Sequence, residues 1–184
     1  MKKEKALLLG RFQPPHLQHY EIIKLSKARP VVFTYALNGK EILAKDLPFS
    51  FKEISRMFEL VGIKTYKLEI ELEEIRKNPL NVFYSKRKEI LSLGNRVVTR
   101  DYSELFPMIM LGLNPVYYPL GQRVIRSSEI RKLLYEGKIE EASLYLPKES
   151  RKVFKDIVRN KNFKELERRG NLKILNFKLP LIYI

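Results

Sequence analysis

The chain has 184 residues, of which 36 are Lys or Arg and 21 are Asp or Glu, so its formal net charge is +15. This length predicts a single domain, and a hydrophobic fraction of 45% excludes a disordered basic tail. A sequence without cysteine excludes a disulfide scaffold, a thiolate metal site and cysteine catalysis. The charge indicates an anionic partner, and phosphorylated metabolites, nucleotides, RNA and an acidic membrane surface all fit it.

Patterns typical of strands and of helices alternate along the first two thirds of the chain. The expected order is strand 5–10, helix 17–28, strand 31–37, helix 50–62, strand 64–72, helix 78–93, strand 96–99, helix 104–111 and strand 116–120. Repeated strand–helix units of this length favour right-handed crossovers. They predict an α/β fold with a Rossmann-like parallel sheet of about five strands and helices on both faces.

The last third of the chain is expected to add a helical segment, residues 128–169, and a terminal strand, residues 172–184. We divide the chain into an α/β domain, residues 1–137, and C-terminal helices and strand, residues 138–184, packed on the same domain. The apolar end of the chain predicts either an extra strand on the sheet or a subunit contact.

A membrane location is not expected. The longest uncharged run, residues 105–122, is interrupted by Pro107, Pro115 and Pro119. The apolar run near the N-terminus is too short for a signal peptide. We therefore expect a cytoplasmic protein that does not bind a membrane.

The loop after the first predicted strand carries both histidines of the chain, in the sequence Gly10-Arg11-Phe12-Gln13-Pro14-Pro15-His16-Leu17-Gln18-His19. Ligands of parallel sheets bind beyond the carboxyl ends of strands. Gly10 allows close approach to the backbone, and the guanidinium of Arg11 suits phosphate oxygens. His16 and His19 share one face of a solvent-facing helix start, which attracts anions. The pattern favours a phosphate site over a surface histidine pair or a two-histidine metal site.

The segment G-R-F-Q-P-x-H-x-x-H resembles the H-x-G-H signature of the nucleotidyltransferase superfamily, in the form found in archaeal-type nicotinamide-nucleotide adenylyltransferases. The second signature of that superfamily, I-S-S-T-x-x-R, has its counterpart at residues 125–131. There, Ser127 or Ser128 is the predicted helix cap, and Arg131 matches the closing arginine. Pro48-Phe49-Ser50 resembles a P-F-T segment of the family, so the likeness covers roughly residues 5–160.

The resemblance implies transfer of AMP from ATP to nicotinamide mononucleotide (NMN) or its acid form, with release of pyrophosphate. It implies catalytic roles for His16, His19 and Arg131. It places the nucleotide against Gly10, Arg11, Phe12, Ser127 and Ser128. It also implies Mg²⁺ held mainly by the phosphates of ATP, no metal site built from protein side chains, and assembly into a homo-oligomer.

Several positions depart from the family pattern. Gln18 replaces a glycine, so its side chain either crowds the nucleotide or points away, and Arg126 replaces a serine. The tryptophan that stacks on the nicotinamide ring is missing because the chain has no Trp; Phe83 or Tyr84 are candidates to replace it. Arg100 at the end of the fourth strand disfavours a cationic ring, which predicts a weaker preference for NMN over its acid form than the resemblance implies.

Two alternative functions remain open at this point. One is a paralogous nucleotidyltransferase that uses another phosphorylated acceptor. The other is a catalytically degenerate protein that binds nucleotides or RNA, with Gln18 and Arg126 as marks of lost catalysis and residues 148–173 as a basic face. RNA is not favoured as a partner, because this segment has only Phe154 and Phe163 as interleaved aromatic residues.

Overall fold

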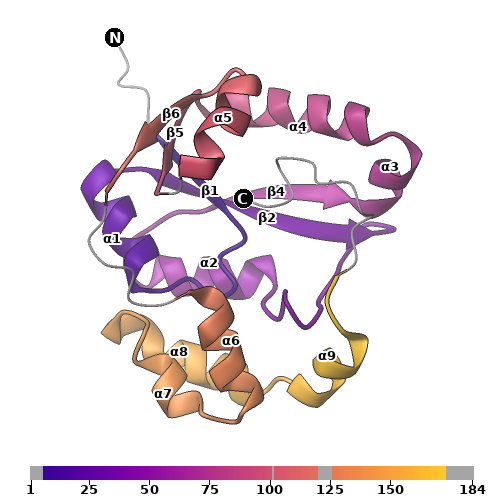
Figure 1. The fold of residues 1–184 in the computed structure, drawn as a ribbon. Helices are drawn as coiled ribbons and strands as arrows, with labels where there is room; N and C mark the ends of the chain where they lie inside the picture. Colours follow the sequence, from indigo (N-terminus) through magenta and orange to yellow (C-terminus); the bar gives the residue numbers. More distant parts are fainter. Residues whose placement is uncertain (1–5, 101, 120–125, 173–184) are drawn as a thin grey trace.

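Six strands form one sheet that helices cover on both sides (Figure 1). The computed structural model describes residues 6–100, 102–119 and 126–172. Its elements are, in chain order, β1 (Leu7–Gly10), α1 (Leu17–Ser26), β2 (Arg29–Leu37), β3 (Lys40–Glu41), α2 (Phe51–Glu59), β4 (Tyr66–Glu71), α3 (Leu72–Lys77), α4 (Pro79–Leu93), β5 (Arg96–Thr99), α5 (Tyr102–Met110), β6 (Asn114–Tyr117), α6 (Ser127–Tyr135), α7 (Ile139–Ser143), α8 (Lys148–Arg159) and α9 (Phe163–Arg169).

The parallel strands lie in the order β4-β2-β1-β5-β6, and β3 pairs antiparallel with the end of β2. The chain builds outward from β1 to β2 and β4, and then returns to the other side of β1 for β5 and β6. Strand order therefore reverses between β1 and β5, which is where open α/β sheets bind ligands. The predicted Rossmann-like fold is confirmed.

The two faces of the sheet have separate hydrophobic cores. Along β1, Leu7 and Leu9 belong to one core and Leu8 to the other, because successive side chains of a strand point to opposite faces. The first core also holds buried residues of α3, α4 and α5, whereas the second joins α1 and α2 to α6, α7 and α8. Figure 1 shows the two groups of helices on opposite sides of the sheet.

Local differences from the sequence-based expectations have simple causes. β3 was missed, although Asn38 and Gly39 both have positive φ and form the turn that joins β2 to β3. α3 was missed as well; acidic side chains in its first turn and basic ones in its last complement the helix dipole. The capping box of Ser50 and Glu53 is present at the start of α2, as predicted.

The C-terminal third is helical as expected, and α6 to α9 occupy it. The predicted terminal strand, residues 172–184, lies outside the described residues apart from Leu172. Across the part of the chain that the structure describes, no helix has the length and apolar character of a membrane span.

Candidate active site

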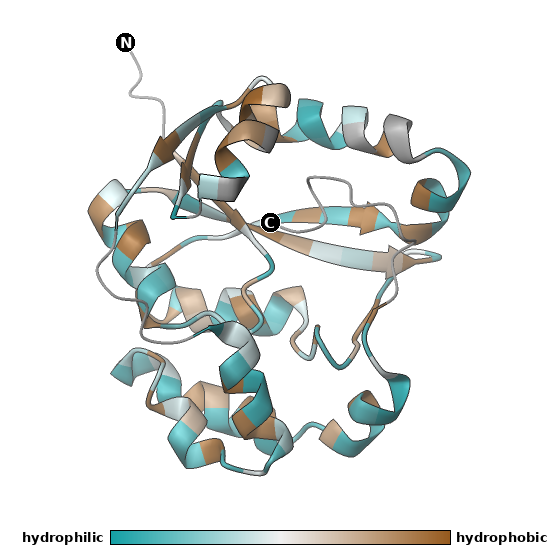
Figure 2. Cartoon of the chain, in the orientation of Figure 1, coloured by the Kyte–Doolittle hydropathy of each residue, from teal (hydrophilic) through white to brown (hydrophobic). Residues whose placement is uncertain are grey.

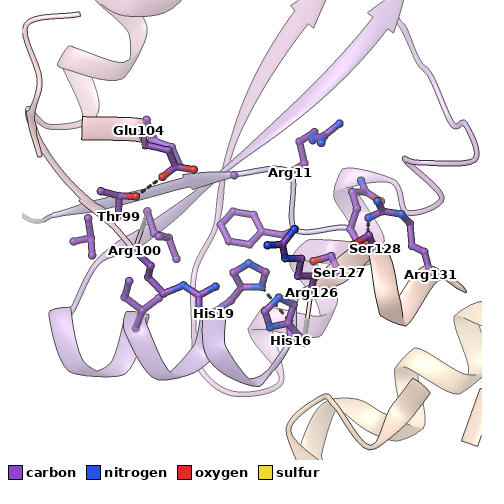
Figure 3. Close-up of a pocket in the computed structure, with 17 residues that line it drawn as sticks. Arg11, His16, His19, Thr99, Arg100, Glu104, Arg126, Ser127, Ser128 and Arg131 are labelled. Atoms are coloured by element: carbon purple, nitrogen blue, oxygen red, sulfur yellow. Dashed lines mark hydrogen bonds between the residues drawn. The ribbon is translucent and has the colours of Figure 1, made fainter. Parts of the chain in front are cut away.

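A cleft of about 420 Å³ lies beyond the carboxyl ends of β1 and β5, where strand order reverses. Its walls come from β1 and the loop that follows, the start of α1, the end of β5 with α5, and the start of α6 (Figure 3). The structure brings together in this cleft all the site residues singled out from the sequence: Gly10, Arg11, Phe12, His16, His19, Ser127, Ser128 and Arg131.

The backbone after β1 turns sharply at Phe12, which has a positive φ of 50°. This turn brings the Phe12 ring back over Gly10, where a Cβ atom would lie 3.2 Å from the ring. The ring is buried and packs edge-on against His19, with 4.9 Å between ring centroids. A side chain at position 10 would therefore displace Phe12 and, with it, His19.

The buried amide of Gln13 holds the loop to the segment before α2. Its Nε2 donates to the carbonyl oxygen of Phe49 over 2.7 Å, and its Oε1 accepts from the backbone N–H of Phe49 over 2.8 Å. Sequence reasoning gave Gln13 no role. The signal was a glutamine in an otherwise apolar and proline-rich loop, because a buried amide needs backbone partners.

The two histidines lie against one another at the start of α1, with ring centroids 3.9 Å apart. His16 is the N-cap residue of α1, and its backbone N–H donates to Nδ1 of His19 over 3.1 Å. Because Nδ1 accepts this hydrogen bond, the proton of a neutral His19 ring is on Nε2. The expectation that both histidines face solvent is wrong for His16, which is only 2% exposed.

The start of α6 is hydrogen-bonded directly to the segment that joins β1 to α1 and carries the two histidines, called the histidine loop below. The hydroxyl of Ser127 donates to the carbonyl oxygen of Pro14 over 3.0 Å. Nη1 of Arg131 donates to the carbonyl oxygen of Gln13 over 2.6 Å. These two bonds bring two motifs more than a hundred residues apart to one cleft.

The predicted cap of α6 at Ser127 or Ser128 is wrong by one or two residues. Arg126 has the extended backbone of an N-cap, and its N–H donates to the carboxylate of Glu129. Ser127 is the first helical residue, because its hydroxyl is engaged by the histidine loop instead of by the helix.

Arg11, Arg126 and Arg131 place positive charge at the end of the cleft formed by the loop after β1 and the start of α6. Nη1 of Arg11 lies 3.5 Å from Oδ2 of Asp46, in a partly exposed ion pair. Burial and the neighbouring charge of Arg11 lower the pKa of Arg131, while Asp46 opposes the shift. An arginine stays protonated despite such a shift, so the cleft suits a polyanion.

The opposite end of the cleft, at β5, contains residues of both charges. Thr99 donates a hydrogen bond to the carboxylate of Glu104, and Arg100 lines the same end of the cleft (Figure 3). Sequence reasoning identified Arg100 but missed Glu104. Glu104 is in α5, five residues after the end of β5, and only the direction of that helix brings it to the cleft.

The structure also shows where two of the residues discussed as departures from the family pattern lie. Gln18 is 5% exposed and is not among the residues that line the cleft, so its side chain does not narrow the cleft. Its Oε1 has no hydrogen-bond partner among the described residues. Tyr84 on α4 is exposed and is also not among the lining residues. The side chain of Phe83, the other candidate to replace the missing tryptophan, lies outside the described part of the chain.

Comparisons with known proteins agree with this geometry. No protein-family model matches the chain. A curated nicotinamide-nucleotide adenylyltransferase from Methanolobus tindarius is 32% identical over 143 residues, which cover 72% of this chain and 78% of that protein. The chain also resembles the structure of a bifunctional NMN adenylyltransferase/ADP-ribose pyrophosphatase from Francisella tularensis, complexed with AMP and a manganese ion. That match has a TM-score of 0.55 and 15% identity, and it covers 89% of this chain and 52% of the other.

The structural match shows the fold alone, and this chain spans about half of the Francisella protein. A Rossmann-like sheet with the two signature motifs bonded together at its switch point agrees with a nucleotidyltransferase enzyme, the class to which the Methanolobus relative belongs. The identity and coverage shared with the Methanolobus protein make the assignment narrower: the chain belongs to the nicotinamide-nucleotide adenylyltransferase family.

Proposed function

We propose that the protein transfers AMP from ATP to NMN or its acid form and releases pyrophosphate. The observation that supports this most directly is the bonding of α6 onto the histidine loop through Ser127 and Arg131. It directs the N-termini of α1 and α6 into one cleft, together with two imidazoles and several guanidinium groups. Such an arrangement attracts a chain of phosphates.

In the proposed reaction, a phosphate oxygen of the acceptor attacks the α-phosphorus of ATP, and the bond from that phosphorus to the bridging oxygen breaks. The electron pair leaves with pyrophosphate. The acceptor phosphate is ionised at pH 7, because its second pKa is about 6, so the reaction needs no general base. The enzyme accelerates the step by positioning the two phosphates and by stabilising the charge that develops.

We assign the role of each residue from the hydrogen-bond donors that it carries. His19 donates from Nε2 to the triphosphate, since its Nδ1 is engaged by the backbone. The ring of His16 packs against the ring of His19, and His16 also lines the cleft. Ser127, Ser128 and Arg131 bind the β- and γ-phosphates at the start of α6. Arg11 binds phosphate, and the backbone of residues 10–12 lies along the nucleotide.

The residues present fit a divalent ion that arrives with the nucleotide. Among the described residues, Glu104 is the one carboxylate that lines the cleft, and no group of three or more His, Asp or Glu side chains is arranged to hold a metal ion. We propose Mg²⁺ bound mainly by ATP phosphates and water. When bound, the ion neutralises charge on the triphosphate.

The test is a pyrophosphate-release assay with ATP and Mg²⁺ against NMN, its acid form and a panel of other phosphate monoesters. Release with NMN or its acid form supports the proposal. Release with another monoester alone would make the protein a paralogous nucleotidyltransferase. ATP binding without release from any acceptor would make it a degenerate binding protein.

The acceptor preference can be tested at the β5 end of the cleft. Both acceptors carry a pyridinium ring, and the acid form adds a carboxylate that suits the positive charge of Arg100. Glu104 offsets that effect, so we expect only a weak preference between NMN and its acid form. Glu104→Gln should shift the ratio of kcat/KM values toward the acid form, and Arg100→Gln should shift it toward NMN. One charge in such a site is worth roughly a factor of ten. Equal ratios in both variants and the parent would show that these residues do not face the acceptor ring.

We also propose that the protein forms a homo-oligomer. Phe106 and Met110 of α5 are 70% and 67% exposed, and Figure 2 shows hydrophobic residues over much of this helix. Large apolar side chains grouped on one helix are typical of a contact surface. Phe106→Glu is expected to lower the molar mass measured by light scattering. Leu25→Glu, at a similarly exposed site on α1, serves as the control; an equal mass for parent and both variants would contradict this surface.

A further inference from the structure

Arg126 occupies an unusual position for an arginine. It is the N-cap residue of α6 and lines the cleft, and Figure 3 places its side chain beside His19 and His16. N-cap positions favour Ser, Thr, Asp or Asn, whose side-chain oxygens accept from the first free N–H groups. A guanidinium has no acceptor, and it adds positive charge at the positive end of the helix dipole. Arg126 is thus locally unfavourable for α6.

Glu129 in the first turn complements the helix dipole, but among the described residues no carboxylate pairs with the guanidinium itself. The carboxylate of Glu129 bonds to the backbone N–H of Arg126, and no ion pair or hydrogen bond of its side chain is found among the described residues. By contrast, Arg11 pairs with Asp46, and Arg131 donates to the loop carbonyl. Of Arg11, Arg126 and Arg131, Arg126 is therefore the one whose guanidinium has no protein partner among the described residues and is available for an anion in the cleft.

We propose that Arg126 binds the triphosphate and stabilises the leaving pyrophosphate; this rests on the proposed adenylyl transfer. Its side chain lies between the two anion-attracting helix starts, with His19 on one side and Ser127 on the other. The bond that breaks is between the α-phosphorus and its bridging oxygen, and the electron pair moves onto pyrophosphate without proton transfer. A guanidinium beside that oxygen gains interaction as the charge develops.

This assignment changes the meaning of the altered signature. The arginine that replaces the first serine adds a cation to the phosphate wall, so it is a gain for catalysis rather than a mark of lost activity. An arginine at this position then lowers the stability of α6 but raises turnover. Replacing a purely structural residue would not change unfolding temperature and turnover in opposite directions.

The experiment compares Arg126→Ser, Arg126→Ala and Arg126→Lys in the full chain, with pyrophosphate release, ATP calorimetry and thermal unfolding as readouts. Serine and alanine should lower kcat by a factor on the order of 10² and raise the Kd for ATP about three- to tenfold, and lysine should recover part of kcat. Arg126→Ser should unfold at the same temperature as the parent, or roughly 2–4 °C higher, because serine is a better N-cap.

Lys132→Ala is the matched control. Lys132 is an exposed cation on the same helix and is not among the residues that line the cleft. Its Nζ lies 4.0 Å from Oε1 of Glu136, so Lys132→Ala removes the same unit of charge together with one weak surface ion pair. Its kcat should equal that of the parent. Unchanged kcat in Arg126→Ser, an equal loss in Lys132→Ala, or a loss in Arg126→Ser that follows a lower unfolding temperature would each overturn the proposal.

Failure of the proposed function is distinguishable from failure of this inference. If the parent protein releases no pyrophosphate with any acceptor, adenylyl transfer is wrong, and ATP calorimetry then decides the role of Arg126. A three- to tenfold rise in Kd for Arg126→Ala, with Lys132→Ala unchanged, would still support the phosphate contact. Equal Kd values for parent and Arg126→Ala would overturn it.

Discussion

Replacing His19 with alanine is expected to lower turnover by a factor on the order of 10² or more, as is typical when one preorganised donor at a site of developing charge is removed. The hydrogen bond from the backbone of His16 occupies Nδ1, so a neutral ring carries its proton on Nε2, the atom that we propose donates to a phosphate oxygen. The loss should appear in kcat with every acceptor that the enzyme uses, because it acts on the triphosphate. Pyrophosphate release under saturating ATP is the measurement.

Two further variants separate the chemistry of His19 from its role at the helix start. In His19→Asn, the amide oxygen takes the place of Nδ1 and can still accept from His16, but no group replaces Nε2. In His19→Gln, the longer amide reaches the position of Nε2. We expect His19→Asn to turn over as slowly as His19→Ala but to unfold at the same temperature as the parent. We expect His19→Gln to turn over about ten times faster than His19→Ala, or more.

Parent-like turnover in His19→Ala would contradict the catalytic role. A collapse of folding in His19→Asn would instead make His19 a structural residue of α1. The neighbouring His16 is a poorer test, because it is buried and its replacement removes packing together with any contact to phosphate.

The site could be predicted from sequence as far as its contacts are local. Gly10, Arg11 and the two histidines lie within one short segment that runs from the end of β1 to the first turn of α1, so strand position and helix spacing place them together. The end of β5 was also predictable, which identified Arg100. The order of the parallel strands and of the helices between them followed from periodicity and helix-end signals, apart from the missed β3 and α3.

What the sequence could not show depends on contacts between distant residues. Local propensity favours Ser127 or Ser128 as the cap of α6, but the hydroxyl of Ser127 is bonded to Pro14 across the fold. Glu104 enters the cleft through the direction of α5, and Gln13 finds its partners at Phe49, 36 residues further along the chain. Each of these depends on tertiary packing, which single-sequence patterns do not contain.

Arg131→Ala is expected to damage both stability and turnover, because its guanidinium serves both. Nη1 bonds to the buried side of the histidine loop, and the fork also lines the cleft. Loss of the bond leaves the carbonyl oxygen of Gln13 without this donor and should cost about 1–3 kcal/mol of unfolding free energy. Loss of the cation should lower turnover by on the order of 10²–10³. Urea unfolding and pyrophosphate release measure the two effects separately.

Two variants separate these effects. Tyr135→Phe on the same helix removes a bond of 2.8 Å from its hydroxyl to the carbonyl oxygen of Lys45, which is a tie between α6 and the rest of the fold outside the cleft. It should cost about 1 kcal/mol of stability and leave turnover near the parent value. Arg131→Lys keeps the charge but loses the fork, so part of the turnover should return. If Arg131→Ala loses stability as Tyr135→Phe does but retains full turnover, Arg131 only ties α6 to the loop, and its assignment to the phosphates is wrong.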